Sequence, residues 1–582
     1  MPDAVGYRWL RLHKLLHIPR FLDPRDQRRV YLVFIACILF GVSFFARVYI
    51  RLTLPVPALG GAYHEGLLKT PRAINPVYAS TNDTDRDFAK LVFSRILTYD
   101  GNGNIVLDLA KQYEMSADGK TYMVTLRENA YWHDGKKVTA EDVLFTISMI
   151  QNPSYKSPFI ANWQGVEIKK IDEYTVQFTL RTPYVPFLEN LTVGILPRHI
   201  WKDVRPEQAL LHEQNLQPIG SGPYRFDRFI KNDDGTISEY RFAWNPDYYR
   251  EGPYIRRLTF TFYDSFEMLL TDWRKGKIDG MSPISKNIEN ELNENRHSLF
   301  SIETPRVFGI FFNQSKNDAL RDKRIREAIA RAISRDAITD YILGEATSKS
   351  TPFPRFGETE PRGDTPTSTI VYDPGKARTL LAEAGYKDEN GDGILERKEK
   401  KKSGNKTIES ETPLSFVLTT SDWPDLLRAA EKIQRDLAAV GIDIQINTVS
   451  LSELDTSVIR PRDFEILLFG HAYGYEPDPF LFWHTSQGKD PGLNIVRYSD
   501  KTSDRLLEEI RTLPDRGERE RRLRELEKRI MQELPMLPIF SEEYLYILPR
   551  RIKGIDPKII SLQSDRFNEV NRWYIDTKRI FK

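Results

Sequence analysis

The stretch at residues 122–143 constrains the fold of this chain more than any other part of the sequence. Three apolar side chains alternate with polar ones at its start: Tyr122, Val124 and Leu126. Such alternation predicts a half-buried strand. Residues 133–135 have the composition of a turn, and Thr139 with Asp142 three positions later has the spacing of a capping box at a helix start. We therefore expect a strand, a turn and a helix here.

The length and periodicity of the chain predict a body of two or three lobes with α/β character. A chain of 582 residues exceeds what one hydrophobic core usually serves. A helix is predicted at residues 425–440, between Pro424 and Gly441, and alternating isoleucines at 442–446 predict a strand directly after it. Strands that alternate with helices of this length indicate sheets covered on both faces.

An apolar segment near the N-terminus predicts a membrane helix. No charged residue stands between Val30 and Ala46, and a snorkelling Arg47 extends the segment to Ile50. Basic residues precede it: Arg8, Arg11, Lys14, Arg20, Arg25, Arg28 and Arg29. The positive-inside rule then keeps the N-terminus in the cytoplasm and sends the main domain outside, to the periplasmic or extracellular face.

The expected order is therefore a basic cytoplasmic tail at 1–29, an uncleaved transmembrane signal anchor at 30–50 and a linker with prolines and glycines at 51–61. Two alternatives stay open for the anchor. One alternative to the uncleaved anchor is a signal peptide that is cleaved. The other is acylation at Cys37, the only cysteine of the chain.

The charge pattern and the motifs exclude several classes of protein. A net charge of +2 without a basic stripe argues against a nucleic-acid partner. We find no nucleophile elbow, no zinc-protease helix and no phosphate-binding loop in the sequence, so we expect no enzyme. An unrecognised hydrolase and a ligand sensor are the alternatives from other functional classes.

Several short sequence motifs resemble those of one known family and follow in the order expected for it. They are Asp-Leu-Ala at 108–110, the strand–turn–helix stretch at 122–143, Pro-Ile-Gly-Ser-Gly-Pro-Tyr at 218–224, Asn-Pro-Asp-Tyr-Tyr at 245–249, Ala-Gly-Tyr at 384–386 and Glu-Pro-Asp-Pro at 476–479. From about Gly60 to the C-terminus the chain resembles the family 5 extracellular solute-binding proteins, which include the oligopeptide and dipeptide receptors of ABC importers.

The resemblance implies an α/β, type II periplasmic-binding-protein fold, with two lobes joined by hinge strands plus an inserted subdomain. On this analogy the solute-binding domain at 62–582 divides into lobe one at about 62–97, 195–305 and 536–582, the inserted subdomain at about 98–194, and lobe two at about 306–535. Segments 308–313 and 538–544 are the expected hinge strands.

The implied function is a membrane-tethered substrate-binding protein that captures peptides by lobe closure and delivers them to the permease subunits of an ABC importer. The protein is expected to act as a monomer. An oligosaccharide-binding receptor of the same fold is the alternative.

In the family, two loops corresponding to 419–423 and 470–475 face the ligand. The resemblance therefore implies these ligand-binding residues: Trp423, His471, Tyr473, Gly474, Tyr475, Asp478 and Trp483. The best-known peptide receptors carry an aspartate at the second loop that pairs with the α-ammonium group of the peptide. Here residues 470–474 read Gly-His-Ala-Tyr-Gly, without an acid. Aromatic, uncharged side chains would also suit the rings of a sugar.

Residues 388–399 fit the pattern of an EF-hand calcium loop. The expected ligands of a structural Ca²⁺ are Asp388, Asn390, Asp392, the carbonyl of Ile394, and Glu399. The sequence at 400–405 does not predict the usual exit helix, so a plain polar loop is the alternative. No other cofactor is expected.

Overall fold

The computed structural model describes residues 23–78, 82–282, 288, 291–293, 295–342, 346–349, 351–354, 370–403, 406–476 and 478–581. These residues form two compact units. One comprises Met1–Leu59 and Ile575–Lys582, and the other comprises Gly60–Tyr574. We describe each unit by itself.

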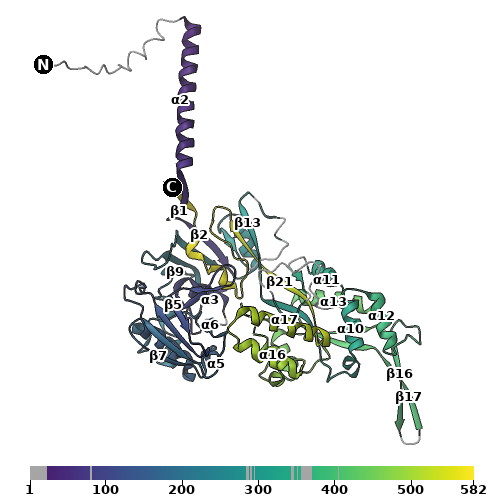
Figure 1. Ribbon diagram of the computed structural model, residues 1–582. Helices are drawn as coiled ribbons and strands as arrows, with labels where there is room; N and C mark the ends of the chain where they lie inside the picture. Colours follow the sequence, from purple (N-terminus) through teal and green to yellow (C-terminus); the bar gives the residue numbers. More distant parts are fainter. Residues whose placement is uncertain are drawn as a thin grey trace, which may run out of the picture. The chain divides into compact units, whose positions relative to one another are not determined.

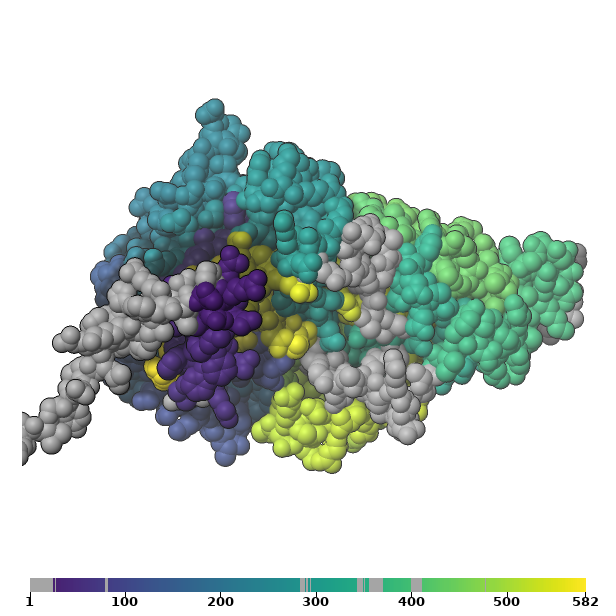
Figure 2. Space-filling model, turned by 90° about the horizontal axis from the view of Figure 1, so that it is seen from above, coloured from purple at the N-terminus to yellow at the C-terminus, as the bar shows by residue number. Residues whose placement is uncertain are grey.

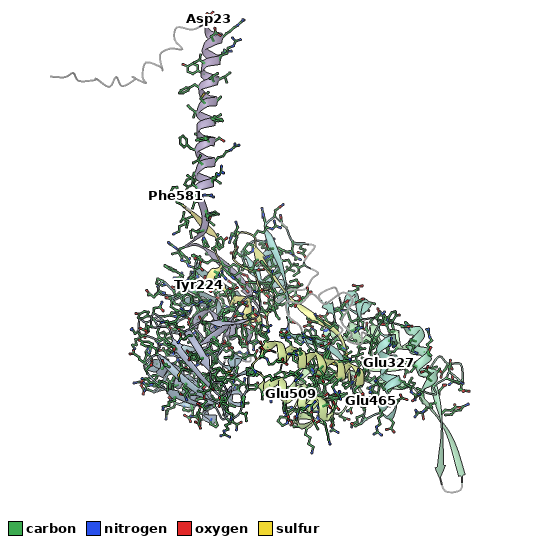
Figure 3. All side chains as sticks on the ribbon, viewed as in Figure 1. Asp23, Tyr224, Glu327, Glu465, Glu509 and Phe581 are labelled. Carbon is green, nitrogen blue, oxygen red and sulfur yellow. The ribbon has the colours of Figure 1, made fainter. Side chains whose placement is uncertain are left out.

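The smaller unit consists of a long helix and a two-stranded ribbon (Figure 1). Helix α2 (Pro24–Leu52) contains a stretch, Arg28–Leu52, that is long and apolar enough to cross a membrane, with a mean hydropathy of 2.2. Strand β1 (Thr53–Ala58) follows directly and pairs antiparallel with β22 (Asp576–Phe581). Figure 3 labels Phe581 beside the end of α2, where its ring meets Tyr49 edge-on at 6.4 Å.

The segment predicted as a linker thus contains a paired strand. Pro55 and Pro57 occupy alternate positions, so the two nitrogens that lack a hydrogen face the same edge of β1 and leave the other edge to pair with β22. Arg579 of β22 reinforces the junction, because its guanidinium donates to the carbonyl oxygens of Ile50 and Thr53 at 2.9 and 3.0 Å. These carbonyls belong to the end of the helix, where no intrahelical donor is available.

The larger unit is built on a sheet of twelve strands in the order β19-β18-β20-β14-β21-β12-β2-β11-β10-β9, with β13 and β15 paired to β21. The strands are β2 (Gly60–Leu67), β9 (Tyr224–Lys231), β10 (Ile237–Trp244), β11 (Ile255–Phe262), β12 (Gly280–Met281), β13 (His297–Glu303), β14 (Arg306–Phe312), β15 (Ala346–Ser348), β18 (Ser415–Ser421), β19 (Asp443–Val449), β20 (Ile466–Ala472) and β21 (Met536–Pro549).

Strand β21 joins the two halves of this sheet. Its residues 536–540 pair with β14, and residues 543–549 pair with β13. We call β2 and β9–β13 with their helices the first lobe, and β14, β15 and β18–β20 with theirs the second lobe. Of the segments expected to act as hinges, 308–313 covers the end of β14 and the residue after it, and 538–544 lies in the middle of β21.

The helices of the larger unit cover both faces of the sheet. The first lobe and the subdomain inserted in it hold α3 (Asp83–Val92), α4 (Ala140–Gln151), α5 (Ile160–Trp163), α6 (Phe187–Asn190), α7 (Arg198–Trp201), α8 (Pro206–Ala209) and α9 (Phe266–Arg274). The second lobe holds α10 (Lys323–Ala332), α11 (Arg335–Tyr341), α12 (Pro374–Glu383), α13 (Pro424–Ala438), α14 (Leu451–Glu453), α15 (Phe480–Trp483), α16 (Lys501–Thr512) and α17 (Arg516–Glu533).

Alternate residues of β14 show why the second lobe needs helices on both sides. Ile310 and Phe312 belong to one buried cluster, with α10 and α13, whereas Val307 and Phe311 belong to another, with α16 and α17. Successive side chains of a strand point to opposite faces, so each face requires its own cover. In Figure 2 the yellow-green atoms, whose colour corresponds to the part of the chain with α16 and α17, form one mass at the surface of the molecule.

The inserted subdomain confirms the strand, turn and helix predicted for residues 122–143. Its sheet has the order β5 (Ala110–Met115), β6 (Thr121–Leu126), β8 (Thr175–Thr179), β7 (Glu167–Lys170), and a short hairpin of β3 (Leu97–Tyr99) and β4 (Ile105–Leu107) precedes it. Helix α4 begins at the predicted capping box, where the backbone N–H of Thr139 donates to Asp142 at 2.9 Å. In the turn, His133 Nδ1 accepts from the backbone N–H of Gly220 at 3.2 Å, which ties two of the sequence motifs together.

Candidate functional site

A cavity of about 290 Å³ lies where the loop after β20 meets the first lobe and the inserted subdomain. Two residues of this loop line the cavity, Gly474 and Tyr475, and the sequence predicts both as ligand-binding residues. The ring of Tyr475 stacks on Tyr99 with 4.0 Å between the centroids, and its hydroxyl donates to Asp565 at 2.9 Å. Tyr475 therefore contacts the opposite lobe as well as the cavity.

Charged side chains from the first lobe and the inserted subdomain line the same cavity. They are Arg86, Lys90, Arg95, Glu189 and Asp565. Lys90 is 8% exposed, and its ammonium group lies 3.1 Å from a carboxylate oxygen of Asp565. This lining differs from the uncharged, aromatic surface that the sequence of residues 470–475 indicates.

Glu189 of α6 brings a carboxylate to the loop that lacks one in the sequence. Its Oε1 accepts from the backbone N–H of Glu476 at 2.9 Å and from the hydroxyl of Tyr99 at 3.0 Å. Gly474 permits this approach, because a Cβ atom there would lie 3.0 Å from Oε2 of Glu189. Burial is the main reason why the pKa of Glu189 is raised to about 7, against the lowering effect of its two hydrogen bonds.

Trp423 lines a second cavity, of about 480 Å³, between the two lobes. Its side chain is 40% exposed and packs edge-on against Phe308 of β14, with 6.1 Å between the ring centroids. The charged residues around this cavity are Asp83, Arg86, Arg306, Asp425, Glu542 and Glu543. Three residues, Arg86, Ser561 and Leu562, line both cavities. The two cavities are therefore neighbouring parts of one cleft between the lobes.

Three other predicted residues, His471, Tyr473 and Trp483, lie inside the second lobe. The ring of His471 packs against Phe311 and Phe482, with centroid distances of 4.7 and 4.3 Å. Among the described residues, neither ring nitrogen of His471 has a hydrogen-bond partner, and burial lowers its pKa to about 3. The hydroxyl of Tyr473 donates to the carbonyl of Pro352 at 3.1 Å, and Trp483 is fully buried. None of the three lines the two cavities.

Asp478 forms an ion pair within the second lobe. Its carboxylate accepts from Arg511 at 2.7 and 3.0 Å, and the hydroxyl of Tyr184 from the inserted subdomain reaches it at 3.4 Å. The carboxylate also accepts from the backbone N–H of Phe480 at the start of α15, at 3.2 Å. The structure thus gives Asp478 an ion pair and a hydrogen bond to the first residue of α15, whose N-cap position is taken by Pro479.

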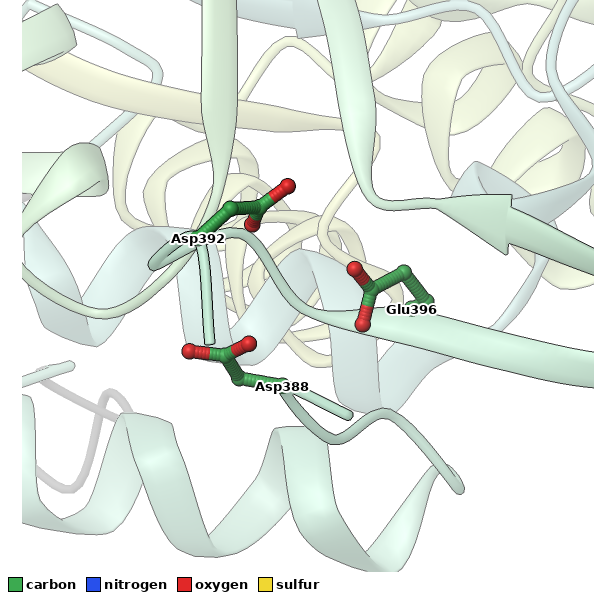
Figure 4. A group of neighbouring side chains, drawn as sticks. All are labelled: Asp388, Asp392 and Glu396. Atoms are coloured by element: carbon green, nitrogen blue, oxygen red, sulfur yellow. The ribbon is translucent and has the colours of Figure 1, made fainter. Parts of the chain in front are cut away.

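The loop that fits the calcium pattern brings three carboxylates together (Figure 4). Oxygens of Asp388, Asp392 and Glu396 all lie within 4.8 Å of one another. Glu396 begins β16 (Glu396–Ser403), which pairs with β17 (Lys406–Pro413), so a hairpin stands where an EF-hand has its exit helix. The side chain of Glu399 lies outside the described residues.

Within this loop the expected ligands make local hydrogen bonds. Asp388 accepts from the backbone N–H groups of Gly391 and Gly393, Asn390 donates to Asp392, and Asp392 accepts from the backbone N–H of Ile394. Glu396 accepts from the backbone N–H of Glu389 at 3.1 Å. Calcium binding remains a prediction.

Two curated proteins align with most of this chain. The chain is 26% identical to the oligopeptide-binding protein AppA of Bacillus subtilis over 528 residues, which cover 89% of this chain and 92% of AppA. It is 25% identical to the dipeptide-binding protein of Escherichia coli over 521 residues, with 84% and 91% coverage.

The structure of Bacillus subtilis AppA in complex with a nonapeptide matches with a TM-score of 0.66 at 26% identity, covering 90% of this chain and all of that one. This match confirms the expected type II periplasmic-binding-protein fold. The model of the bacterial extracellular solute-binding proteins, family 5, matches residues 104–492. The chain therefore belongs to family 5 of the bacterial extracellular solute-binding proteins.

Proposed function

We propose that this protein captures short peptides in the cleft between its lobes for import by an ABC transporter. The observation that carries the proposal is the lining of the cleft, which combines cations such as Lys90 and Arg95 with acids such as Glu189 and Asp425. A peptide carries both an ammonium and a carboxylate group, and its amide groups require polar partners when they leave water. The hydroxyls of an uncharged oligosaccharide could also hydrogen-bond to these groups, but such a sugar has no charge to pair with them.

The relatives support the same choice. AppA and the Escherichia coli protein bear the names of oligopeptide- and dipeptide-binding proteins, and each aligns over most of this chain. We infer that capture proceeds by closure of the lobes, and the support is that Tyr475 and Glu189 make contacts across the cleft, which closure of the lobes would hold together. A ligand that bridges the lobes would then shift the population toward the closed state.

We further propose that α2 remains attached as a single membrane anchor, with the N-terminus in the cytoplasm and the solute-binding unit outside. The support is the length and apolar character of Arg28–Leu52 and the basic residues before it. Cys37 lies within α2 rather than before a polar tether, which disfavours acylation. Delivery to a permease, by a monomeric receptor, completes the proposal.

Calorimetry of the purified full-length protein in detergent tests the choice of ligand. Pools of di-, tri- and oligopeptides are titrated beside pools of neutral oligosaccharides. We expect saturable heat with peptides only, and mass spectrometry of the bound peptides should show them unchanged, as a receptor requires and a hydrolase would not allow. Binding of oligosaccharides without peptides would reject the proposal in favour of the alternative receptor.

Membrane fractionation with N-terminal sequencing tests the anchor. The full-length chain with residues 1–52 retained should sediment with membranes and resist extraction by high salt. Recovery of a soluble chain that begins after α2 would show a cleaved signal peptide instead.

A further inference from the structure

Two cations of the first lobe face the smaller cavity from adjoining positions. Lys90 stands in the last turn of α3, and Arg95 follows three residues after that helix ends. Both side chains line the cavity beside Gly474 and Tyr475, opposite the second lobe. They come from a segment that the sequence motifs did not mark as functional.

Asp565, the acid that contacts Lys90, is already engaged by other donors. Asp565 accepts from the backbone N–H groups of Ser561 and Leu562 at 3.2 and 2.9 Å and from the hydroxyl of Tyr475, besides its contact with Lys90. One carboxylate therefore serves four donors. It has little capacity left to neutralise a second cation.

Arg95 holds its guanidinium in place without an acid. Its Nη1 donates to the backbone carbonyls of Phe93 at 3.1 Å and Lys90 at 3.5 Å, and among the described residues no carboxylate forms an ion pair with it. The nearby Asp108 receives the hydroxyl of Tyr249 at 2.7 Å and the backbone N–H of Arg95 at 2.9 Å. The guanidinium thus keeps donors that face the cavity.

The electrostatics of Lys90 agree with this arrangement. Burial, and next the charge of Arg95, lower the pKa of Lys90 to about 8 in spite of the contact with Asp565. Two cations that repel each other in a partly dry cavity would both be stabilised by an anion bound between them. The cavity of about 290 Å³ leaves room for such a group.

We infer that the smaller cavity is a subsite for a carboxylate of the solute, which Lys90 and Arg95 bind together. The inference rests on the proposed function, since it takes the cavity as part of the peptide cleft. Arg95 supplies a planar set of donors that suits a carboxylate, while Lys90 adds a point charge. The carboxylate belongs either to the C-terminus of a peptide or to an acidic side chain, and the probes below separate these two sources.

The test uses calorimetry on the full-length protein in detergent with three synthetic probes. These are trialanine with a free C-terminus, trialanine amide, and Ala-Glu-Ala amide. We expect a probe that keeps a carboxylate to bind about 10- to 100-fold more tightly than trialanine amide, which is the range for hydrogen bonds to charged groups. Preference for trialanine identifies the C-terminus as the source, and preference for Ala-Glu-Ala amide identifies the side chain.

Two variants and a control assign the effect to the pair. Arg95→Met should remove most of the preference for the carboxylate probe while leaving the affinity for trialanine amide unchanged. Lys90→Met should act likewise, but it leaves Asp565 without its cation, so Arg95→Met is the decisive variant if Lys90→Met fails to fold. Lys111→Met, on the exposed side of β5, is the matched control and should bind as the wild type does.

A second measurement detects proton uptake by Lys90 on binding. At pH 8.5 a bound carboxylate should make Lys90 take up a proton, so the heat of binding should depend on the ionisation enthalpy of the buffer in the wild type and not in Lys90→Met. Equal affinities for the acid and amide probes would overturn the carboxylate subsite and leave peptide capture intact. Binding of no peptide at all would overturn the proposed function itself, and this inference with it.

Discussion

Replacing Arg566 by methionine is expected to destabilise the larger unit by about 3–5 kcal/mol, the usual cost of leaving buried carboxylates without their cation. Arg566 is fully buried, and its guanidinium donates to both oxygens of Asp87, at 2.8 and 2.6 Å, and to Glu65 at 2.9 Å. Both carboxylates are fully buried as well. Glu65 and Asp87 lie near the N-terminal end of the larger unit, and Arg566 lies near its C-terminal end.

The size of the effect follows from desolvation. Breaking an exposed ion pair returns both ions to water, whereas here two carboxylates would stay in a dry environment that also contains the hydroxyls of Tyr63 and Tyr546. The guanidinium also lies over the ring of Phe567, 4.1 Å from its centroid, and methionine replaces only the apolar part of that contact. A loss of this size is a large share of the 5–15 kcal/mol that commonly stabilises a folded protein.

Urea denaturation followed by circular dichroism measures the free energy of unfolding. The matched control is Arg274→Met, which breaks an exposed pair with Glu291 at 2.6 Å and should leave the stability nearly unchanged. A further variant adds Glu65→Gln and Asp87→Asn to Arg566→Met and should recover much of the loss, since no charge is then buried. A loss below about 1 kcal/mol for Arg566→Met, or no recovery on neutralisation, would refute the reasoning.

The effect should grow with pH. Burial raises the pKa of Asp87 to about 6 in the folded protein although Arg566 lowers it. The pKa in the folded protein stands above the ordinary value of 3.8 for an aspartic acid, so the contribution of Asp87 to stability is present below about pH 4 and is lost as the pH rises through about 6. Without Arg566 the pKa of Asp87 should rise further. The variant should therefore differ from the wild type less at pH 5 than at pH 8.

Three further outcomes are expected. Tyr475→Phe removes a hydrogen bond between the lobes and should raise the radius of gyration of the ligand-free protein in X-ray scattering. The control, Tyr473→Phe, loses a hydrogen bond inside the second lobe and should leave the radius of gyration unchanged. Equal radii of gyration for the two variants would contradict a role of Tyr475 in closure. Millimolar Ca²⁺ should raise the melting temperature of the wild type but not that of a variant with Asp388→Asn and Asp392→Asn, and an unchanged wild type would identify a plain polar loop. Thr139→Ala should cost about 1 kcal/mol of stability in urea, and no loss would show that the capping box is dispensable.

Local patterns predicted the elements whose cause is local. The strand, turn and helix of the inserted subdomain follow from alternation and from a cap whose two partners stand three residues apart. Helix α13 begins at Pro424 and ends shortly before Gly441, which adopts a φ of +86°, so proline and glycine delimit it as expected. In these cases the residues that decide the structure are neighbours in the chain.

The candidate site could be predicted only in part. The sequence indicated the loop after β20, but not which of its residues face the cleft. Tyr473 and His471 point into the core, whereas Gly474 and Tyr475 line the cavity. Lys90 and Glu189 carry no signal in the sequence, since a charged residue on a helix is ordinarily a solvated one. Their burial depends on segments that lie far away in the chain.

By itself the sequence determined the family, the alternation of strands and helices in the body and the presence of one apolar N-terminal helix. The tertiary structure decided that β1, with its two prolines, pairs with the C-terminal strand, that Arg566 neutralises Asp87, and that cations line the cleft. The reason is physical. Hydrophobic period and turn chemistry act between neighbouring residues, whereas the partner of a charge or of a strand edge is set by which distant segments packing brings together.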